Sequence, residues 1–328
     1  MLYYDMGDNM EKKIFTNKIF TTIFAIICGV LWGSAFPVLK LSYQSLNILP
    51  QNTFQKIYFA GLRFFIASMM IFILVKFILK IDIKIKKENI FIVFILGLLQ
   101  TAIMYFFFYN GLSYTSGIKS SILISSNNFF VVIFAHFIYK NDKLNFNKIL
   151  GLFTGFLGIV LVNFNKLPLD LSFNFLGEGF LLISALTGTF GTFLAKKLSV
   201  DIHPFKLTAW QMLFGASTLL VVGKIGIQNP LNFNSFSLML LFYAAFISAA
   251  AFSLWYMLLK HNKAGEITIY RFIIPVSGSI LSIIFLESEV FSINILFALI
   301  LVSIGIIKIN KDKKIRDKKE QEKLSNIK

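Results

Sequence analysis

Residues 19–41 read IFTTIFAIICGVLWGSAFPVLKL, a stretch in which Lys40 is the only charged side chain. An α-helix needs about 20 mostly apolar residues to cross the hydrocarbon core of a bilayer. This stretch meets that length, so it predicts a transmembrane helix.

The rest of the chain repeats this pattern nine times. The ten apolar runs are Ile19–Leu41, Ile57–Leu79, Ile90–Gly111, Ile118–Tyr139, Ile149–Phe164, Leu176–Ala195, Phe205–Val222, Ser237–Leu259, Ile267–Leu286 and Phe291–Ile309. Hydrophobic residues make up 56% of the 328 residues and charged residues 15%, below the roughly 25% of soluble domains. Mean hydropathy is +0.74. We therefore expect an all-α membrane protein with ten transmembrane helices.

Basic residues alternate between the segments that separate these runs. Twenty-four of the 32 Lys and Arg residues lie before the first run, in every second gap or in the C-terminal tail, and five lie in the other gaps. Cytoplasmic loops carry the excess of Lys and Arg. We therefore expect a multi-pass protein of the cell (inner) membrane with both termini in the cytoplasm. The net charge of +16 then follows from membrane orientation, and we expect no nucleic-acid partner.

The two halves of the sequence correspond at an offset of 147 residues. Asn128 precedes Asp142 by 14 positions, as Pro275 precedes Glu289. Five helices per half is an odd number, so the halves must enter the membrane in opposite orientations, as in many secondary transporters. The predicted organisation is a cytoplasmic N-terminal segment (1–18), a first repeat (19–164), an external linker (165–175), a second, inverted repeat (176–309) and a basic cytoplasmic tail (310–328).

Several short motifs recur in the helices where a known family has them. They are GVLWGSAFP at 29–37, GLRFF at 61–65, Gly151-x3-Gly155-x2-Gly158, WQMLFG at 210–215, AFSLWY at 251–256, NKAGE at 262–266 and IPV at 274–276. Together they resemble the EamA repeat of the drug/metabolite transporter (DMT) superfamily, over about residues 20–309. The resemblance implies ten helices and movement of small metabolites without ATP hydrolysis. Asn127-Asn128 stands where the first repeat usually has Pro, which predicts a fourth helix less bent than the ninth. Asp142 replaces the usual Glu.

Ionisable side chains within apolar runs are costly in a bilayer and are therefore functional candidates. Arg63 is either a cation for a substrate carboxylate or phosphate, or a packing residue that binds helix carbonyls. Glu266 and Lys119 hold matching positions near opposite faces and are candidate coupling or gate charges. Alternatively, Glu266 favours the positive end of its helix and Lys119 reaches water. Arg271 is a further gate candidate, with an ion pair to Glu266 or to a neighbouring helix open to it. Asp142, beside a loop, is expected to be a solvated capping residue.

Uncharged polar and aromatic groups within the runs are the stronger candidates for a lined cavity, because an amide in hydrocarbon requires a partner or water. With Arg63, the candidate cavity residues are Trp32, Ser34, Gln100, Tyr105, Asn127, Asn128, Gln211, Trp255, Tyr256 and Tyr270. Trp255 and Tyr256 fit an interfacial belt equally well. The candidate hinge residues are Gly33, Pro37, Pro275 and Gly278, although close helix packing also explains the glycines.

Soluble-type catalytic motifs are absent from the sequence. It contains neither Gly-x4-Gly-Lys-Ser/Thr nor His-Glu-x2-His, and we expect no cofactor, no metal site and no enzymatic activity. The predicted function is a secondary transporter that moves a small metabolite, such as an amino acid or a drug, by alternating access, with export favoured by the family resemblance. The alternative is an intramembrane enzyme acting on a lipid-linked substrate through Arg63, Lys119 and Glu266. The expected partners are the substrate and the lipid bilayer, and a homodimer is left open.

Overall fold

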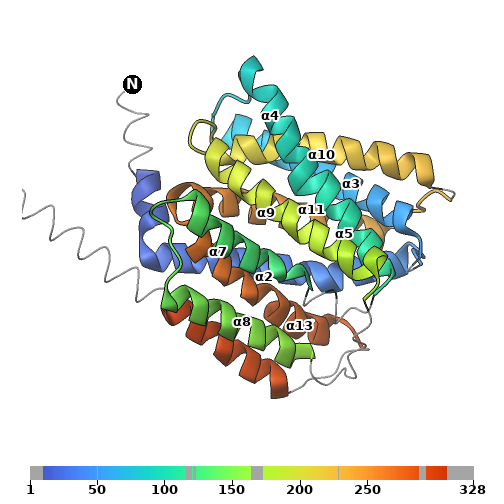
Figure 1. Cartoon of the computed structure of the whole chain (residues 1–328). Helices are drawn as coiled ribbons and strands as arrows, with labels where there is room; N and C mark the ends of the chain where they lie inside the picture. Colours follow the sequence, from blue (N-terminus) through green and yellow to red (C-terminus); the bar gives the residue numbers. More distant parts are fainter. Residues whose placement is uncertain are drawn as a thin grey trace, which may run out of the picture.

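A computed structural model of the chain describes residues 10–49, 51–115, 120, 123–163, 173–227, 229–287 and 293–308. These residues form helices and no strand (Figure 1). The elements of the first half are α2 (Lys18–Ser45), α3 (Thr53–Ile73) with the π-turn η1 (Leu74–Ile78), α4 (Lys87–Gly97), η2 (Leu98–Ile103), α5 (Met104–Ser113), α7 (Ser126–Ile138) and α8 (Phe146–Asn163).

The second half follows the same plan. Its elements are η4 (Phe175–Gly179), α9 (Phe180–Leu198), α10 (Pro204–Gly226), α11 (Ser235–His261), α12 (Ala264–Ile267), η5 (Thr268–Phe272) and α13 (Ile273–Phe285). A last apolar helix, Ile293–Lys308, lies beside α8 and is red in Figure 1.

Seven of the helical segments are long and apolar enough to span a membrane, by length and composition. Three shorter apolar helices, Ser126–Ile138, Phe146–Leu161 and Ile293–Lys308, fall in the fourth, fifth and tenth predicted runs. The prediction of an all-helical, multi-pass membrane protein is therefore confirmed. That these three also span the membrane, making ten, stays a prediction.

The outer surface of the bundle is apolar. Phe77, Phe137, Phe153 and Ile225 are each more than half exposed, and similar side chains extend along most helices. Soluble proteins rarely expose apolar patches of this extent. A bilayer supplies the solvent that such side chains need, because lipid tails are as apolar as the side chains.

The equivalent second helices of the two halves, α3 and α10, cross in opposite directions. Ser68 donates to the carbonyl of Ala209 (2.9 Å) near one end, whereas Gly61 lies against Leu220 near the other. A Cβ on Gly61 would approach the backbone nitrogen of Leu220 to 2.9 Å, so the glycine permits the close approach. Antiparallel equivalent helices are what an inverted repeat requires.

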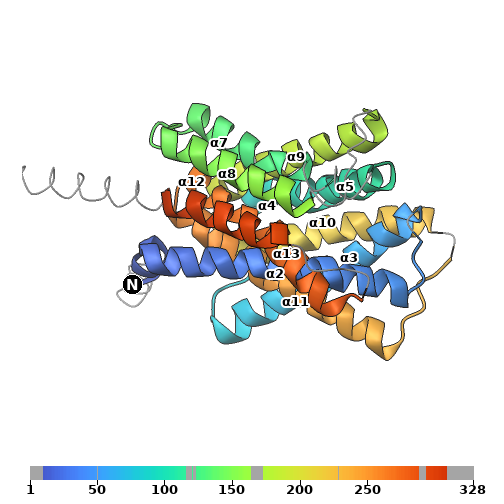
Figure 2. The ribbon, with the colours of Figure 1, turned by 90° about the horizontal axis from the view of Figure 1, so that it is seen from below.

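Two further helix pairings occur in both halves with the same relative direction (Figure 2). In the first pairing α2 runs antiparallel to α11, and its counterpart is α9 against α5. In the second pairing α2 runs parallel to α13, with Gly33 against Ser277, and its counterpart is α9 along α7. The core between these pairs is where the two halves meet.

Candidate functional site

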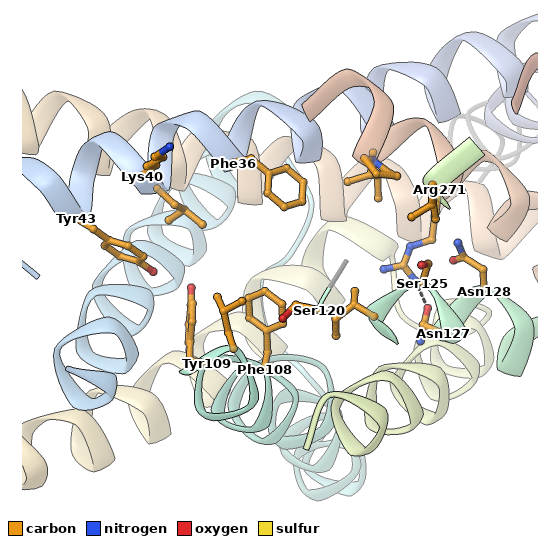
Figure 3. Close-up of a pocket in the computed structure, with 16 residues that line it drawn as sticks. Phe36, Lys40, Tyr43, Phe108, Tyr109, Ser120, Ser125, Asn127, Asn128 and Arg271 are labelled. Atoms are coloured by element: carbon orange, nitrogen blue, oxygen red, sulfur yellow. Dashed lines mark hydrogen bonds between the residues drawn. The ribbon is translucent and has the colours of Figure 1, made fainter. Parts of the chain in front are cut away.

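A cavity of about 430 Å³ lies between the two halves (Figure 3). It follows α2 from Phe36 to Tyr43 and is lined on its other sides by residues of α5, α7, α8, η5 and α13. A smaller cavity of about 180 Å³ adjoins it and reaches toward α9 and α11. The two share the lining residues Phe36, Phe108, Ile124, Asn127, Arg271 and Ile274.

The offset of 147 residues that relates the two halves pairs residues of this shared wall with one another. It maps Ile124 onto Arg271 and Asn127 onto Ile274, and all four line both cavities. The first half thus contributes the amide and the second half the cation. The site is built on the repeat symmetry but is chemically asymmetric.

Pro275 accounts for the break in the helix at Arg271, which lines the shared wall. Pro275 lacks a backbone N–H, and its ring clashes with the carbonyl of the residue four positions earlier, which is Arg271. The ninth predicted run is accordingly divided into α12, the 3₁₀ turn η5 and α13. Short 3₁₀ stretches within a helix often mark hinges. The fourth run is interrupted too, at Ser125, although no proline follows it.

The Arg271 guanidinium contacts one amide and two indoles. Its Nη1 donates to Oδ1 of Asn127, and its central carbon lies 5.6 Å from the ring of Trp32 and 5.8 Å from that of Trp255. Cation–π contacts of this kind stabilise a desolvated cation. Among the described residues no acidic side chain lies within ion-pairing distance of Arg271, so Glu266 is not its partner.

Asn127 is held in place by α9. Its Nδ2 donates to the carbonyl of Ala185 (2.8 Å) and to Oγ1 of Thr189 (2.9 Å). Both amide donors are used, which leaves Oδ1 directed at Arg271. The Asn127 amide therefore fixes the guanidinium at the wall of the cavity.

The sequence-predicted cavity residues divide into two groups. Trp32, Gln100, Tyr105, Asn127 and Trp255 line the smaller cavity, and Asn128, the hinge candidate Pro275 and again Asn127 line the larger one. Ser34, Arg63, Gln211, Tyr256 and Tyr270 line neither. Gln211 accepts from Thr101 (3.0 Å) and joins α10 to η2, and Tyr270 lies 2.9 Å from Oγ1 of Thr22.

Among the predicted hinge residues, Pro37 is buried within α2, and Gly33 and Gly278 lie where α2 crosses α13. Glu266 is 7% exposed in α12. Lys119 falls outside the described residues.

Arg63 is enclosed by helix backbone and side chain rather than by the cavity. It is 2% exposed, and its Nε donates to the carbonyl of Ala244 (3.2 Å) and to Oγ of Ser248 (2.7 Å). The guanidinium also lies over the ring of Phe64. These contacts join α3 to α11. They correspond to the second of the two roles considered for Arg63, that of a packing residue that binds a neighbouring helix.

Several lining residues were not singled out from the sequence. They are mostly aromatic: Phe36, Tyr43, Phe108 and Tyr109. With 39 Phe and 11 Tyr in the chain, aromatic content alone carries no positional signal. A helical-periodicity search for aromatic residues on the Trp32 face of its run would have found Phe36, one turn later.

At the opposite end of the bundle, where α2 begins, polar contacts close the space between helices. Glu11, in a helical segment over residues 10–16, lies 3.0 Å from Lys260 Nζ, 2.8 Å from His261 Nε2 and 3.5 Å from His203 Nε2. Burial alone raises the pKa of Glu11, but hydrogen bonds from His203, His261 and Lys260 lower it well below its usual value. Nδ2 of Asn262 donates to the carbonyl of Phe15.

A second cluster at this end corrects an expectation. Asp142 is not a solvated cap: it is 1% exposed, lies 2.5 Å from Lys148 Nζ and accepts from the backbone N–H of Gly265 (2.9 Å). The reason is that the loop between α7 and α8 folds onto the start of α12. The Asp142 cluster therefore fastens the start of α12, and the Glu11 cluster fastens the end of α11 to the N-terminal helical segment, both at the end remote from the cavity.

The chain is similar to known transporters over most of its length. The sequence model described as "EamA-like transporter family" matches residues 19–164 and again 175–311. The uncharacterized transporter YoaV of Bacillus subtilis is 26% identical over 280 residues, which cover 84% of this chain and 92% of that protein. A chloroplastic WAT1-related protein of Arabidopsis thaliana is 24% identical over 61% of this chain and 50% of its own length.

One solved crystal structure has the same fold. It superposes with a TM-score of 0.73 at 15% identity and covers 88% of this chain and 97% of its own.

Proposed function

Because the chain belongs to the EamA-like transporter family, we propose that it is a secondary transporter that moves a small metabolite across the cytoplasmic membrane by alternating access. The observation that carries this proposal is the cavity between the halves, which lies at one end of α2 while polar contacts close the other end. Secondary transporters of inverted-repeat type bind substrate where their halves meet.

The cavity occupies only one part of the bundle's length. Together with the smaller cavity it extends along α2 from Trp32 to Tyr43, about 16 Å at 1.5 Å per residue. No residue of α2 before Trp32 lines either cavity. Phe36, which lines both cavities, is 49% exposed.

The distribution of basic residues supports an orientation for this state. The positive-inside rule places the start of α2 and the ends of α9 and α11 on the cytoplasmic side. The Glu11 and Asp142 clusters then form a closed inner gate, and the cavity faces outward. Opening to the cytoplasm requires those contacts to break and the helices around Tyr43 and Tyr109 to close.

Residues with helix-breaking properties lie where the halves move against each other in this cycle. Gly33 and Gly278 meet at the crossing of α2 and α13, and Pro275 follows η5. We assign hinge roles to these residues and to Pro37.

Glu266 is the proposed coupling group. It lies in α12, close behind the inner gate, and is buried in a segment whose backbone binds Asp142. Protonation of a carboxylate here would remove a charge from the gate region. Export of the substrate in exchange for protons is the direction that we propose.

Flux in proteoliposomes tests the proposal. Vesicles loaded with labelled amino acids and organic acids would be assayed with and without a pH gradient, using wild type, Glu266→Gln and, as a matched control, Glu88→Gln in the exposed first turn of α4. We expect saturable flux that the gradient accelerates, and loss of the acceleration in Glu266→Gln only. Flux equal to that of protein-free vesicles for every compound would contradict the transport proposal, and an unaltered Glu266→Gln would reduce Glu266 to a helix-end charge.

A further inference from the structure

The Arg271 guanidinium has unused donors at the cavity wall. A guanidinium carries five N–H groups, and one of the Nη1 donors is directed at Asn127. The cation lies over the rings of Trp32 and Trp255, with its central carbon 5.6 Å and 5.8 Å from their centroids. Within the described part of the chain no acceptor other than Asn127 hydrogen-bonds to the guanidinium, and Arg271 lines both cavities.

The charged residues among the described lining of the cavities, Arg271 and Lys40, are both basic. Lys40 lines the far end of the larger cavity, and none of the described lining residues is acidic. A cation in a low-dielectric site attracts an anion far more strongly than it does in water. The same field disfavours an ammonium group, for which the described wall offers no carboxylate.

Most of the remaining wall is aromatic or aliphatic, and its polar members include Gln100, Ser125 and Asn128. Trp32 and Trp255 pack edge to face, with ring centroids 5.3 Å apart, and Phe36 and Phe108 line both cavities. The volume of about 430 Å³ falls within the roughly 300–1,000 Å³ of small-molecule sites. Such a wall suits an apolar body whose single charged group reaches Arg271.

We propose that the cavity selects organic monocarboxylates with an apolar or aromatic body, that Arg271 binds the carboxylate, and that Asn127 positions the guanidinium. This substrate class rests on the proposed transport function. The planar fork of arginine pairs with both carboxylate oxygens at once, so lysine at this position preserves the charge but not the paired geometry. Zwitterionic amino acids bind more weakly than the matching acids, because their ammonium group enters a positive field.

Calorimetric titration of the purified protein tests this substrate preference directly, with four compounds that share a phenyl ring on a three-carbon chain and differ in their polar groups. They are 3-phenylpropanoate, phenylalanine, 3-phenylpropylamine and 3-phenylpropan-1-ol. We expect the acid to bind about 10- to 100-fold more tightly than the other three, as charge-assisted hydrogen bonds predict. Arg271→Gln should abolish the preference, whereas Arg271→Lys should retain its sign at lower affinity. Lys86→Gln, at an exposed loop position, should match wild type.

Three results would overturn the proposal: equal or tighter binding of the amine, an unchanged preference in Arg271→Gln, or no binding of any compound by protein that elutes as a single folded species. Arg271→Lys keeps the test decisive should the glutamine variant misfold. Flux of the same four compounds separates this proposal from the transport function. Flux without preference for the acid rejects the substrate class alone, whereas selective binding of the acid without flux of any compound rejects transport alone.

Discussion

Two arginines that the sequence presents alike, Arg63 in α3 and Arg271 in η5, differ in what surrounds them. Arg63 donates to a carbonyl and a hydroxyl of α11 and lines neither of the two cavities. Arg271 is fixed by one amide and two indoles and lines both cavities. A buried cation whose donors meet the backbone of a neighbouring helix holds the bundle together. A cation whose donors face a cavity is available to a ligand.

Removal of the Arg63 side chain should have the larger effect on stability. We expect Arg63→Gln to lower the free energy of unfolding by about 2 kcal/mol, because a charged donor leaves the acceptors on α11. The thermal unfolding midpoint in detergent, followed by circular dichroism, measures this. Ser248→Ala, which removes one acceptor only, should cost about 1 kcal/mol.

The ligand preference of Arg63→Gln, measured on protein that still folds, sharpens the comparison. It should equal that of wild type. A stable Arg63→Gln that no longer distinguishes acid from amine would show that both arginines act on the ligand and would break the comparison.

Removal of the Arg271 side chain should change stability less. We expect the unfolding free energy of Arg271→Gln to lie within about 1 kcal/mol of wild type, because the loss of one charge-assisted hydrogen bond and of the contacts with two indoles is offset by removal of an unpaired, desolvated cation. The same unfolding measurement applies, alongside flux of 3-phenylpropanoate, which should fall at least about tenfold. A loss of stability as large as that of Arg63→Gln would instead make Arg271 a packing residue.

The smallest effect is expected at the closed end and depends on pH. The folded-state pKa of Glu11 is lowered by hydrogen bonds from His203, His261 and Lys260, despite the opposing effect of burial. Its contribution to stability is therefore present above the ordinary glutamate pKa of about 4.3 and is lost as the pH falls through the lowered value. The difference in unfolding midpoint between wild type and Glu11→Gln should be largest at pH 6, smaller at pH 4 and smallest at pH 3.

Exposed Glu88 supplies the control for this pH series, because Glu88→Gln should leave the midpoint unchanged at each pH. A Glu11→Gln difference that grows toward acid would contradict the assigned contacts.

The sequence predicts the helical, membrane-embedded class because both depend on local composition. The apolar runs are long, and the positions of Gly33 and Pro275 within them indicate close approach and a break in winding. The placement of the arginines is different, since whether a guanidinium meets a carbonyl or a cavity depends on α2, α7 and α11, far away in sequence. Glu11 was missed for the same reason: its partners lie about 190 and 250 residues later.

The 3₁₀ turn that carries Arg271 gives the ninth helix a rotational degree of freedom. Such a turn advances about 120° per residue and rises about 2.0 Å, against about 100° and 1.5 Å in an α-helix. Rewinding the five residues of Thr268–Phe272 into α-helix would turn α13 relative to α12 by about 100° and shorten the segment by about 2.5 Å. The guanidinium would sweep around the helix axis with that change. A local exchange of winding would thus move the Arg271 cation relative to Asn127 and the two indoles without a larger movement of the two halves.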